Sequence, residues 1–494
     1  MEEEANTGDG LRDRAVRGVA WSALRNWGSR IVTLAVWIVL ARILSQEAFG
    51  LIAAATAYVA LVNVFVEQGF VSAIIQREEV EDGHLDTAFW TSVALGVVLA
   101  GASVVAAPFV ARFFDQPQLG PIIAWMAPAL VLAALAGMPQ ALFERALDYR
   151  LLAIREFIAV AVGGVVGVAM AVQGYGVWSL VGWQLSERTA SVAVLWAATT
   201  WRPGVAVTAR HFRDLFSFGI NIVGTNLLDY LNNRSDDLII LYVLGPTALG
   251  FYEIAYRLFT NGTQLVAQSV SSVAFSTFSR IQGDVARLRR AFYTTTQVAS
   301  VVAFPLFLGA AALAPQLVEL LFGAKWLPQS AQVFQVLAAL GVLHAVFYFN
   351  GPVMLAMGKP HWRLGLNTLN AVANVAVVLA VVQWGIVAVA AAYTVRGYVL
   401  APLQVWVVRR LLRFRVREYM RRLLPALLCS LAMAGIVAGA VYLAAGRVGI
   451  VGVVGGGVLL GAVVYVGLIR LVSTALFEKV RELLYLVLPT SRNS

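Results

Sequence analysis

The chain is a succession of apolar segments, each about as long as a lipid bilayer is thick, joined by short polar loops. A helix needs about 20 predominantly apolar residues to cross the hydrocarbon layer. Of the 494 residues, 60% are hydrophobic and only 13% are charged, whereas soluble proteins carry roughly 25% charged residues. The sequence therefore predicts an all-α membrane protein with about fourteen transmembrane helices.

The expected helices form two groups of six and a final pair. The first group lies near residues 18–43, 48–75, 87–113, 119–141, 152–173 and 176–200. The second lies near residues 214–244, 247–279, 291–322, 328–357, 361–382 and 384–408, and the pair near 421–444 and 448–470. This pattern predicts a cytoplasmic tail (1–17), an N-terminal lobe (18–200), a cytoplasmic linker (201–213), a C-terminal lobe (214–408), a basic cytoplasmic loop (409–420), the final helix pair (421–470) and a cytoplasmic tail (471–494).

A weak internal repeat at an offset of 200 residues supports two related lobes. LARILSQEAFGLIAAATAYV at 40–59 aligns with ILYVLGPTALGFYEIAYRLF at 240–259. The alignment pairs Leu44 with Leu244, Ala48 with Ala248 and Gly50 with Gly250. Six helices separate the copies, and because six is even, both copies run in the same direction, as in transporters with parallel repeats. A chance match of two short apolar strings is the alternative.

The distribution of Lys and Arg predicts the orientation. Of the 37 such residues, 27 lie in one set of alternating loops and tails and only four in the other. Cytoplasmic loops retain positive charge during insertion, so both termini are expected in the cytoplasm. The acidic loop at 77–84 departs from this pattern, but carboxylates have little weight in orientation.

Polar side chains follow one face of two neighbouring expected helices, the seventh and the eighth, and the second helix adds a polar pair. Each ionisable group at a helix centre costs roughly 2.5–3.5 kcal/mol, so such groups persist mainly where a partner or a hydrated cavity receives them. The second helix carries Asn63 and Glu67; the seventh carries Asn226, Asp229, Asn233 and Asp236 at helical spacing, with Asp237 beside them; the eighth carries Glu253, Arg257, Asn261, Gln264 and Gln268. These stripes predict a hydrated central cavity.

The charges within the helices have two expected roles. Guanidinium groups offer forked donors that suit phosphate, and the candidates are Arg25, Arg30, Arg234 and Arg257. Carboxylates can neutralise these arginines or bind a coupling proton or cation such as Na⁺, and the candidates are Glu67, Asp229, Asp236, Asp237 and Glu253.

Structural roles compete with these functional ones. Glu253 and Arg257 can form a structural ion pair at i and i+4. Interfacial solvation can account for Asp236 and Asp237, and Arg30 can extend to the interface. The sixth expected helix carries Glu187 and Arg188, and the twelfth carries Arg396. We interpret the two arginines as packing or interfacial charges.

Signatures of other functional classes are absent from the sequence. There is no GxxxxGK[ST] or HExxH motif, and Cys429 is the only cysteine. We therefore expect no catalytic residues, no metal ligands and no bound cofactor. The basic residues are scattered between apolar runs, which argues against nucleic acid as a partner.

The sequence resembles the Wzx-like polysaccharide and oligosaccharide flippases of the multidrug/oligosaccharidyl-lipid/polysaccharide exporter superfamily, nearest to the colanic-acid exporter branch. The resemblance rests on GVAWSALRNWGSRIVTLAVWIVLARILSQEAFGLIA, QALFERALDYRLLAIRE, DDLIILYVLGPTALGFYEIAYRLF, LVELLFGAKWLPQSAQVFQVLAAL and VMLAMGKPHWR, in this order. It implies a MATE-like fold of two six-helix lobes around a central cavity, an added C-terminal pair of helices, and alternating access.

The resemblance also implies a function in the bacterial inner membrane. The usual substrate of the family is an oligosaccharide repeat unit on undecaprenyl pyrophosphate, moved to the periplasmic leaflet for exopolysaccharide, capsule or O-antigen synthesis. By position, Arg25, Arg30, Arg234 and Arg257 resemble the cavity cations that meet the pyrophosphate. Polysaccharide polymerase and chain-length proteins are candidate partners.

Three alternatives stay open at this point. A cation-coupled multidrug exporter and a lipid II flippase belong to the same superfamily. A membrane glycosyltransferase or polymerase belongs to a different class, but it is expected to carry larger periplasmic loops than this chain has. We therefore expect a transporter and not an enzyme.

Overall fold

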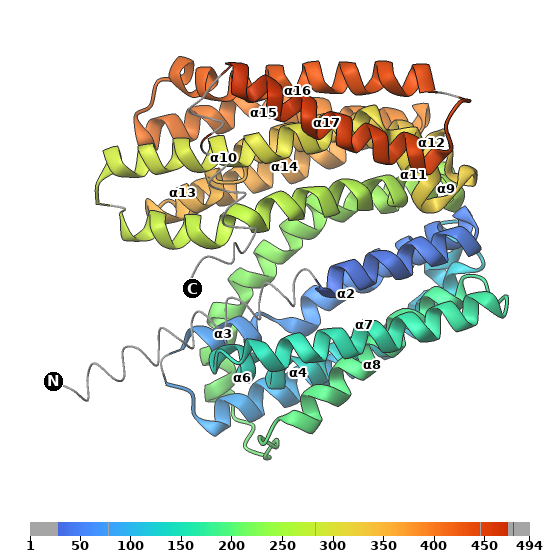
Figure 1. Ribbon diagram of the computed structural model, residues 1–494. Helices are drawn as coiled ribbons and strands as arrows, with labels where there is room; N and C mark the ends of the chain where they lie inside the picture. The colour runs from blue at the N-terminus through green and yellow to red at the C-terminus, as the bar shows by residue number, and fades with distance from the viewer. Residues whose placement is uncertain (1–27, 78, 282, 445, 473–477, 479–494) are drawn as a thin grey trace, which may run out of the picture. The chain divides into compact units, whose positions relative to one another are not determined.

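The computed structural model describes residues 28–77, 79–281, 283–444, 446–472 and 478, with their side chains except at 218, 266–277 and 279–280. All regular secondary structure in these ranges is helical, which confirms the predicted all-α class. By its internal contacts the chain divides into two compact units, Met1–Gly250 and Phe251–Ser494, which Figure 1 lets the reader follow by colour.

The helices of the first unit begin with residues 28–43. They continue with α2 (Gln46–Glu67), α3 (Phe70–Gln76), α4 (Asp82–Phe113), α5 (Leu119–Met126), α6 (Pro128–Arg145), α7 (Tyr149–Val172), α8 (Trp178–Ala198) and the first part of α9 (Ala209–Arg280). The second unit contains the rest of α9, then α10 (Val285–Ala312), α11 (Ala314–Phe322), η1 (Ala324–Trp326), α12 (Gln329–Phe347), α13 (Asn350–Ala356), α14 (Pro360–Val381), η2 (Val382–Trp384), α15 (Ile386–Leu412), α16 (Val416–Ala444) and α17 (Ile450–Val472).

Polar residues at helix starts define several of these boundaries. The Ser45 hydroxyl accepts a hydrogen bond from the backbone N–H of Ala48 at 3.2 Å, which caps α2. The Asp148 carboxylate accepts from the backbone N–H of Leu151 at 3.1 Å and caps α7. Each cap satisfies an N–H group that has no partner inside its helix.

Within the described residues, eleven helices are long and apolar enough to cross a membrane. One of them, Gly219–Leu265 within α9, has 47 residues, about twice the length that one crossing needs. It is interrupted at Gly245, whose φ of 81° and ψ of 176° are not helical. Helix α8 is not among the eleven because Gln184, Glu187 and Arg188 make its centre polar.

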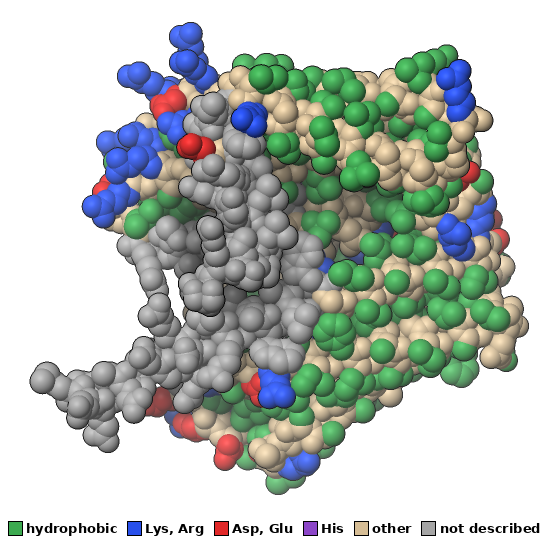
Figure 2. Space-filling model, in the orientation of Figure 1, with side chains coloured by type: hydrophobic (Ala, Val, Ile, Leu, Met, Phe, Trp, Pro, Cys, Tyr) green, Lys and Arg blue, Asp and Glu red, His purple; other side chains and the backbone are tan. Residues whose placement is uncertain are grey.

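The sides of the helices are apolar where they are exposed. Val105 of α4 and Leu459 of α17 are each 69% exposed. On the face drawn in Figure 2, hydrophobic side chains cover the flanks of the helices, whereas most Lys and Arg side chains lie at helix ends. Apolar exposure of this extent is typical of helices that contact lipid, and the chain is a multi-pass membrane protein.

The two copies of the sequence repeat meet at their matching glycines. A Cβ atom at Gly50 of α2 would lie 1.7 Å from the carbonyl oxygen of Pro246 in α9, and one at Gly250 would lie 2.0 Å from the carbonyl oxygen of Gln46. Gln46 and Pro246 are also 200 residues apart. Adding 200 to one partner of the first contact and subtracting 200 from the other therefore gives the second contact. Reciprocal contacts are what a two-fold relation between two copies produces, and this pair supports the repeat.

Candidate functional site

A polar pocket of about 390 Å³ lies among the helices of the Met1–Gly250 unit. Small residues of α6, including Ala133, Ala136 and Gly137, leave space for it. Helices α2, α3, α6, α7 and α8 provide its polar lining: Asn63, Glu67, Ser72, Gln140, Arg155, Glu156, Glu187, Arg188 and Ser191. Ionisable groups inside a membrane protein mark substrate or ion sites by default, so this pocket is the candidate site.

Helix α2 brings Asn63 and Glu67 to the pocket wall, one helical turn apart. The Asn63 Nδ2 atom donates a hydrogen bond to Glu67 Oε1 at 2.7 Å. This bond orients the carboxylate and leaves its second oxygen for another donor. The two polar residues predicted in the second helix thus lie together in the pocket wall.

Glycines of α7 allow α8 to approach closely enough to place its charged pair in the pocket. A Cβ atom at Gly163 would lie 2.8 Å from the Cβ of Glu187, and one at Gly167 would lie 2.7 Å from the Cβ of Trp183. Both distances are shorter than the contacts that side-chain Cβ atoms make in proteins. Any larger residue at either position would separate the helices and move Glu187 and Arg188.

The arginines of the pocket are held beside acceptors. Arg155 Nη1 donates to Gln140 Oε1 at 2.9 Å, and Arg155 Nη2 lies 3.5 Å from Glu156 Oε2. Arg188 interacts electrostatically with Glu187 and Glu67. Arg188 thus contributes to the pocket, whereas the sequence analysis interpreted it as a packing or interfacial charge.

Arg30, in the helix over 28–43, interacts electrostatically with Glu156 of the pocket wall. This places one of the four predicted phosphate-binding arginines near the pocket. Its predicted companion Arg25 lies outside the described residues.

Arginines and carboxylates are both present at this site, and this mixture determines its chemistry. The arginines at 30, 155 and 188 face the carboxylates at 67, 156 and 187. A guanidinium group binds phosphate with two parallel hydrogen bonds, as it does a carboxylate. A phosphate group entering the pocket can therefore replace a carboxylate as partner of an arginine without leaving the arginine unpaired.

Arg234, in the first half of α9, forms an ion pair on its own helix. Its Nη1 atom lies 3.1 Å from Asp237 Oδ2, three residues on. The Asp237 and Asp236 side chains are buried, at 1% and 2% exposure, whereas Arg234 is partly exposed. This burial excludes the interfacial solvation considered for the two aspartates.

Arg257, in the second half of α9, pairs with Glu253. Its Nη2 and Nε atoms lie 3.0 and 3.3 Å from Glu253 Oε1. The carboxylate is 5% exposed and the guanidinium 32%. The structural ion pair considered for these two residues is thus present, and the exposed side of the guanidinium keeps N–H donors that this pair does not use.

The other polar residues predicted along α9 lie in mixed environments. Asp229 and Asn233 are exposed, and Asn233 Nδ2 donates to the carbonyl oxygen of Asp229 at 2.7 Å. Asn226 and Asn261 are half-buried, and Gln264 is exposed. The side chain of Gln268 lies outside the described part of the chain. A shared role for this set in a central cavity stays a prediction.

A family model described as "Polysaccharide biosynthesis protein" matches residues 39–331, which is more than half of the chain. The chain belongs to this family. The matched range contains all of α2 to α8 and α9, and so all of the pocket and both ion pairs of α9. This confirms the resemblance drawn from the sequence.

Relatives within this group cover most of the chain at low identity. The lipopolysaccharide biosynthesis protein WzxC of Escherichia coli is 26% identical over 71% of the chain and 71% of its own length. The teichuronic acid biosynthesis protein TuaB of Bacillus subtilis is 25% identical over 87% of the chain and 89% of its own length. The succinoglycan biosynthesis transport protein ExoT of Rhizobium meliloti is 28% identical over 63% of each chain.

Solved structures establish the fold of this polysaccharide biosynthesis protein. The lipid II flippase MurJ in an inward closed conformation matches with a TM-score of 0.77 at 15% identity, covering 90% of this chain and 97% of its own. An inward-facing multidrug resistance MATE family transporter of the MOP superfamily matches with a TM-score of 0.63 at 14% identity, covering 78% and 94%. The predicted MATE-like fold is therefore confirmed.

Sequence reasoning overlooked several residues of the pocket. Arg155 and Glu156 are adjacent near the start of an expected helix, where charges are common at the membrane interface. Gln140 lies in the last part of α6, and a single glutamine there gives no signal of its own. What identifies them is their mutual contact at the pocket, since Arg155 contacts both Gln140 and Glu156. Only the packing of α6 against α7 reveals this.

Proposed function

We propose that this protein is a flippase that carries undecaprenyl-pyrophosphate-linked oligosaccharide repeat units from the cytoplasmic to the outer leaflet by alternating access. The observation that carries the proposal is the arginine-bearing pocket among membrane helices of a polysaccharide biosynthesis protein. The product serves the synthesis of exopolysaccharide, capsule or O-antigen.

The relatives agree with this activity. Their names refer to the biosynthesis of lipopolysaccharide, teichuronic acid and succinoglycan, and one is called a transport protein. The fold is shared with a protein named a lipid II flippase. From these names we infer a substrate made of sugars on a lipid carrier, and the diphosphate is part of our proposal.

The chemistry of the pocket suits the head group of such a lipid. Arg155 and Arg188 can each turn from a carboxylate to a phosphate oxygen, while Asn63 and Gln140 offer amide groups to sugar hydroxyls. In the proposed cycle Arg30, Arg234 and Arg257 meet the diphosphate as the head group moves. After the lipid leaves, carboxylates neutralise the arginines again or bind a coupling proton or Na⁺ while the transporter returns to its first conformation. The candidates are Glu67, Asp229, Asp236, Asp237 and Glu253.

We propose fourteen transmembrane helices with both termini in the cytoplasm. Eleven apolar spans are described, and the 47-residue span of α9 counts as two crossings because Gly245 interrupts it. Helix α8 and the helix over 28–43 bring the number to fourteen. Polysaccharide polymerase and chain-length proteins would receive the product on the far side, and no catalytic step is assigned to this chain.

Deletion of the gene tests the proposed function. We expect undecaprenyl-linked oligosaccharide to accumulate on the cytoplasmic leaflet and surface polymer to disappear, both restored by the wild-type gene. Lethality with accumulation of lipid II would indicate a lipid II flippase. Unchanged lipid intermediates together with new sensitivity to toxic dyes would indicate a drug exporter.

A further inference from the structure

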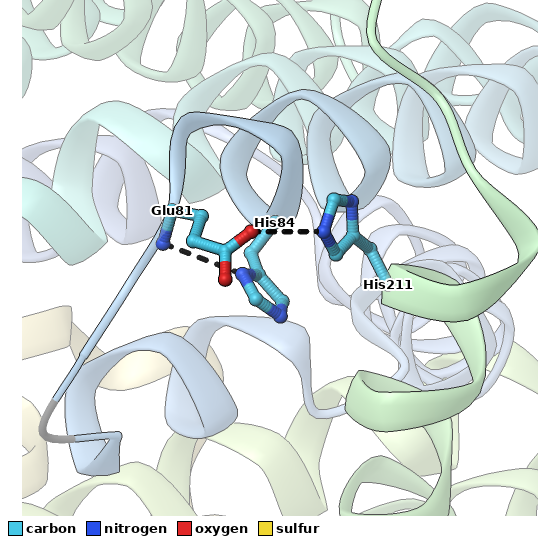
Figure 3. A group of neighbouring side chains, drawn as sticks. All are labelled: Glu81, His84 and His211. Carbon is cyan, nitrogen blue, oxygen red and sulfur yellow. Dashed lines mark hydrogen bonds and ion pairs between the residues drawn. The ribbon is translucent and has the colours of Figure 1, made fainter.

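Two histidines and a carboxylate that are far apart in the sequence meet where α4 and α9 begin. Glu81 is the residue that precedes α4, His84 lies in the first turn of α4, and His211 lies in the first turn of α9. One potential ligand atom from each of the three lies within 4.8 Å of the other two. Figure 3 shows the Glu81 carboxylate beside both imidazole rings.

The polar contacts at the two ligand nitrogens of this cluster are long, and a cation would take their place. His211 Nε2 lies 3.3 Å from Glu81 Oε2. His84 Nδ1 accepts the backbone N–H of Glu81 at 3.3 Å, a long hydrogen bond, and its ring is 5% exposed. The buried Nε2 atom of His84 has no hydrogen-bond partner in the described residues, and the nearest carboxylate oxygen, on Asp214, is 3.9 Å away.

The surroundings of both rings match the outer shell of a metal site. Histidine ligands usually direct the second ring nitrogen to an oxygen that fixes the ring and its tautomer. His84 Nε2 lies 3.9 Å from Asp214 Oδ2, and His211 Nδ1 lies 2.9 Å from the Thr208 hydroxyl oxygen. With a cation on His84 Nδ1 and His211 Nε2, both second nitrogens carry protons that face these oxygens.

A glycine in α4 and the linker before α9 allow these side chains to lie close together. A Cβ atom at position 83 would lie 2.3 Å from Cε1 of His211, so Gly83 is needed for the ring to reach its place. The preceding linker is held to α4, since Asp86 Oδ1 accepts the backbone N–H of Gly204 at 2.8 Å. Trp90 Nε1 also donates to the Gly204 carbonyl oxygen at 2.7 Å. These two hydrogen bonds hold the linker before α9 against α4, and so help to place His211 beside Glu81.

We propose that Glu81, His84 and His211 bind a divalent transition metal, with Zn²⁺ as the best match, and that Asp214 and Thr208 orient the two imidazoles. Two imidazoles and one carboxylate with an open fourth position suit Zn²⁺, whereas Mg²⁺ and Ca²⁺ prefer oxygen ligands alone. Ligand atoms about 2.1 Å from one ion are at most about 4.2 Å apart, so binding draws the cluster together slightly. Arg77 also acts on His84, but two carboxylates against one guanidinium leave these groups net negative.

The metal ties the start of α9 to the start of α4. This role is independent of the proposed sugar-lipid substrate, because none of these residues lines the polar pocket. It also revises the expectation of no metal ligands, which the sequence could not test because His211 is 127 residues away from His84.

Zinc binding to the purified full-length protein, free of any histidine tag, tests the proposal. After treatment with a chelator and gel filtration, we expect the protein to take up roughly one zinc ion per chain, as measured by elemental analysis. In competition with a zinc indicator, Asp214→Asn should weaken binding by roughly 10–100-fold, the usual effect of losing an outer-shell partner. His211→Ala and Glu81→Gln should weaken it further.

Two further variants keep the test decisive if a ligand variant folds poorly. Gly83→Ala retains all three ligand residues but displaces the His211 ring, so it should lower zinc affinity. His361→Ala removes an exposed histidine of α14 and should leave affinity unchanged. Zinc should raise the melting temperature of the wild-type protein and of His361→Ala but not of His211→Ala. Zinc uptake far below one ion per chain, or equal affinity in wild type and His211→Ala, would overturn the proposal, whatever the outcome of the gene deletion.

Discussion

Several arginines of the described residues form ion pairs with carboxylates of the same helix. Arg155 lies beside Glu156, Arg234 beside Asp237 and Arg257 beside Glu253. In each of the two pairs of α9 the carboxylate is buried and the guanidinium is partly exposed. This arrangement leaves part of each guanidinium at the surface, while the buried carboxylate keeps an ion-pair partner.

The Glu253–Arg257 pair permits a direct test of this arrangement. Arg257→Ala removes the ion-pair partner of a buried carboxylate, so it should lower the free energy of unfolding by about 1–3 kcal/mol. The double variant Glu253→Gln/Arg257→Ala should recover part of this loss, since no charge is left in the buried position. Thermal unfolding in detergent measures both. Equal stability of Arg257→Ala and the wild type would show that Glu253 does not depend on this partner.

The individual residues of the pocket were only partly predictable. Asn63 and Glu67 were identified because a carboxylate deep in an apolar segment is unusual, and both line the pocket. Arg155 and Arg188 were not, because a charge near a helix end or beside another charge has ordinary explanations. Whether such a side chain faces lipid or a cavity depends on packing between helices, and this is where the sequence lacks information.

At the scale of helices, the pattern of hydropathy was sufficient to locate most boundaries. The expected segments near 119–141 and 421–444 correspond to α5–α6 and α16 within a few residues. The break of α9 at Gly245 lies between two expected segments. Short helices such as α3 and α13 were not separated from their neighbours, because breaks at Gly69 and Tyr348–Phe349 do not interrupt the apolar pattern.

The crossing of α2 and α9 gives a prediction at this scale. At Gly50 an added methyl group meets the Pro246 carbonyl oxygen, which belongs to the backbone and cannot turn aside. Gly50→Ala should therefore lower the free energy of unfolding by about 1–3 kcal/mol, measured by thermal unfolding. Gly250→Ala should have a similar effect, because its contact with Gln46 is the reciprocal one.

Gly101 of α4 provides the matched control for this substitution. It is exposed and no atom lies within 4 Å of an added Cβ. Gly101→Ala should leave stability unchanged or raise it by up to about 1 kcal/mol, because alanine favours helix. Equal effects at Gly50 and Gly101 would mean that the close crossing is not formed.

At the scale of the whole molecule, the orientation can be measured with single cysteines. The background is Cys429→Ala, which removes the only native cysteine. In this background Arg447→Cys, between α16 and α17, should react with an impermeant maleimide added outside intact cells. Val205→Cys, in the linker before α9 and 92% exposed in the native residue, should react only after permeabilisation. The reverse pattern would place both termini outside.

The central claim is that arginines inside the membrane helices carry an anionic sugar-lipid across the bilayer. Its most direct test is transport in vesicles that contain the purified protein and a labelled undecaprenyl-pyrophosphate oligosaccharide, with an impermeant glycosidase added outside. The account predicts that wild type and Arg447→Ala expose the inner-leaflet lipid to the enzyme, and that Arg155→Ala/Arg188→Ala does so at least about 10-fold more slowly, since each lost charged hydrogen bond contributes about 1.5–3 kcal/mol. Inner-leaflet lipid that stays protected with wild-type protein, or equal rates for wild type and the double variant, would contradict it.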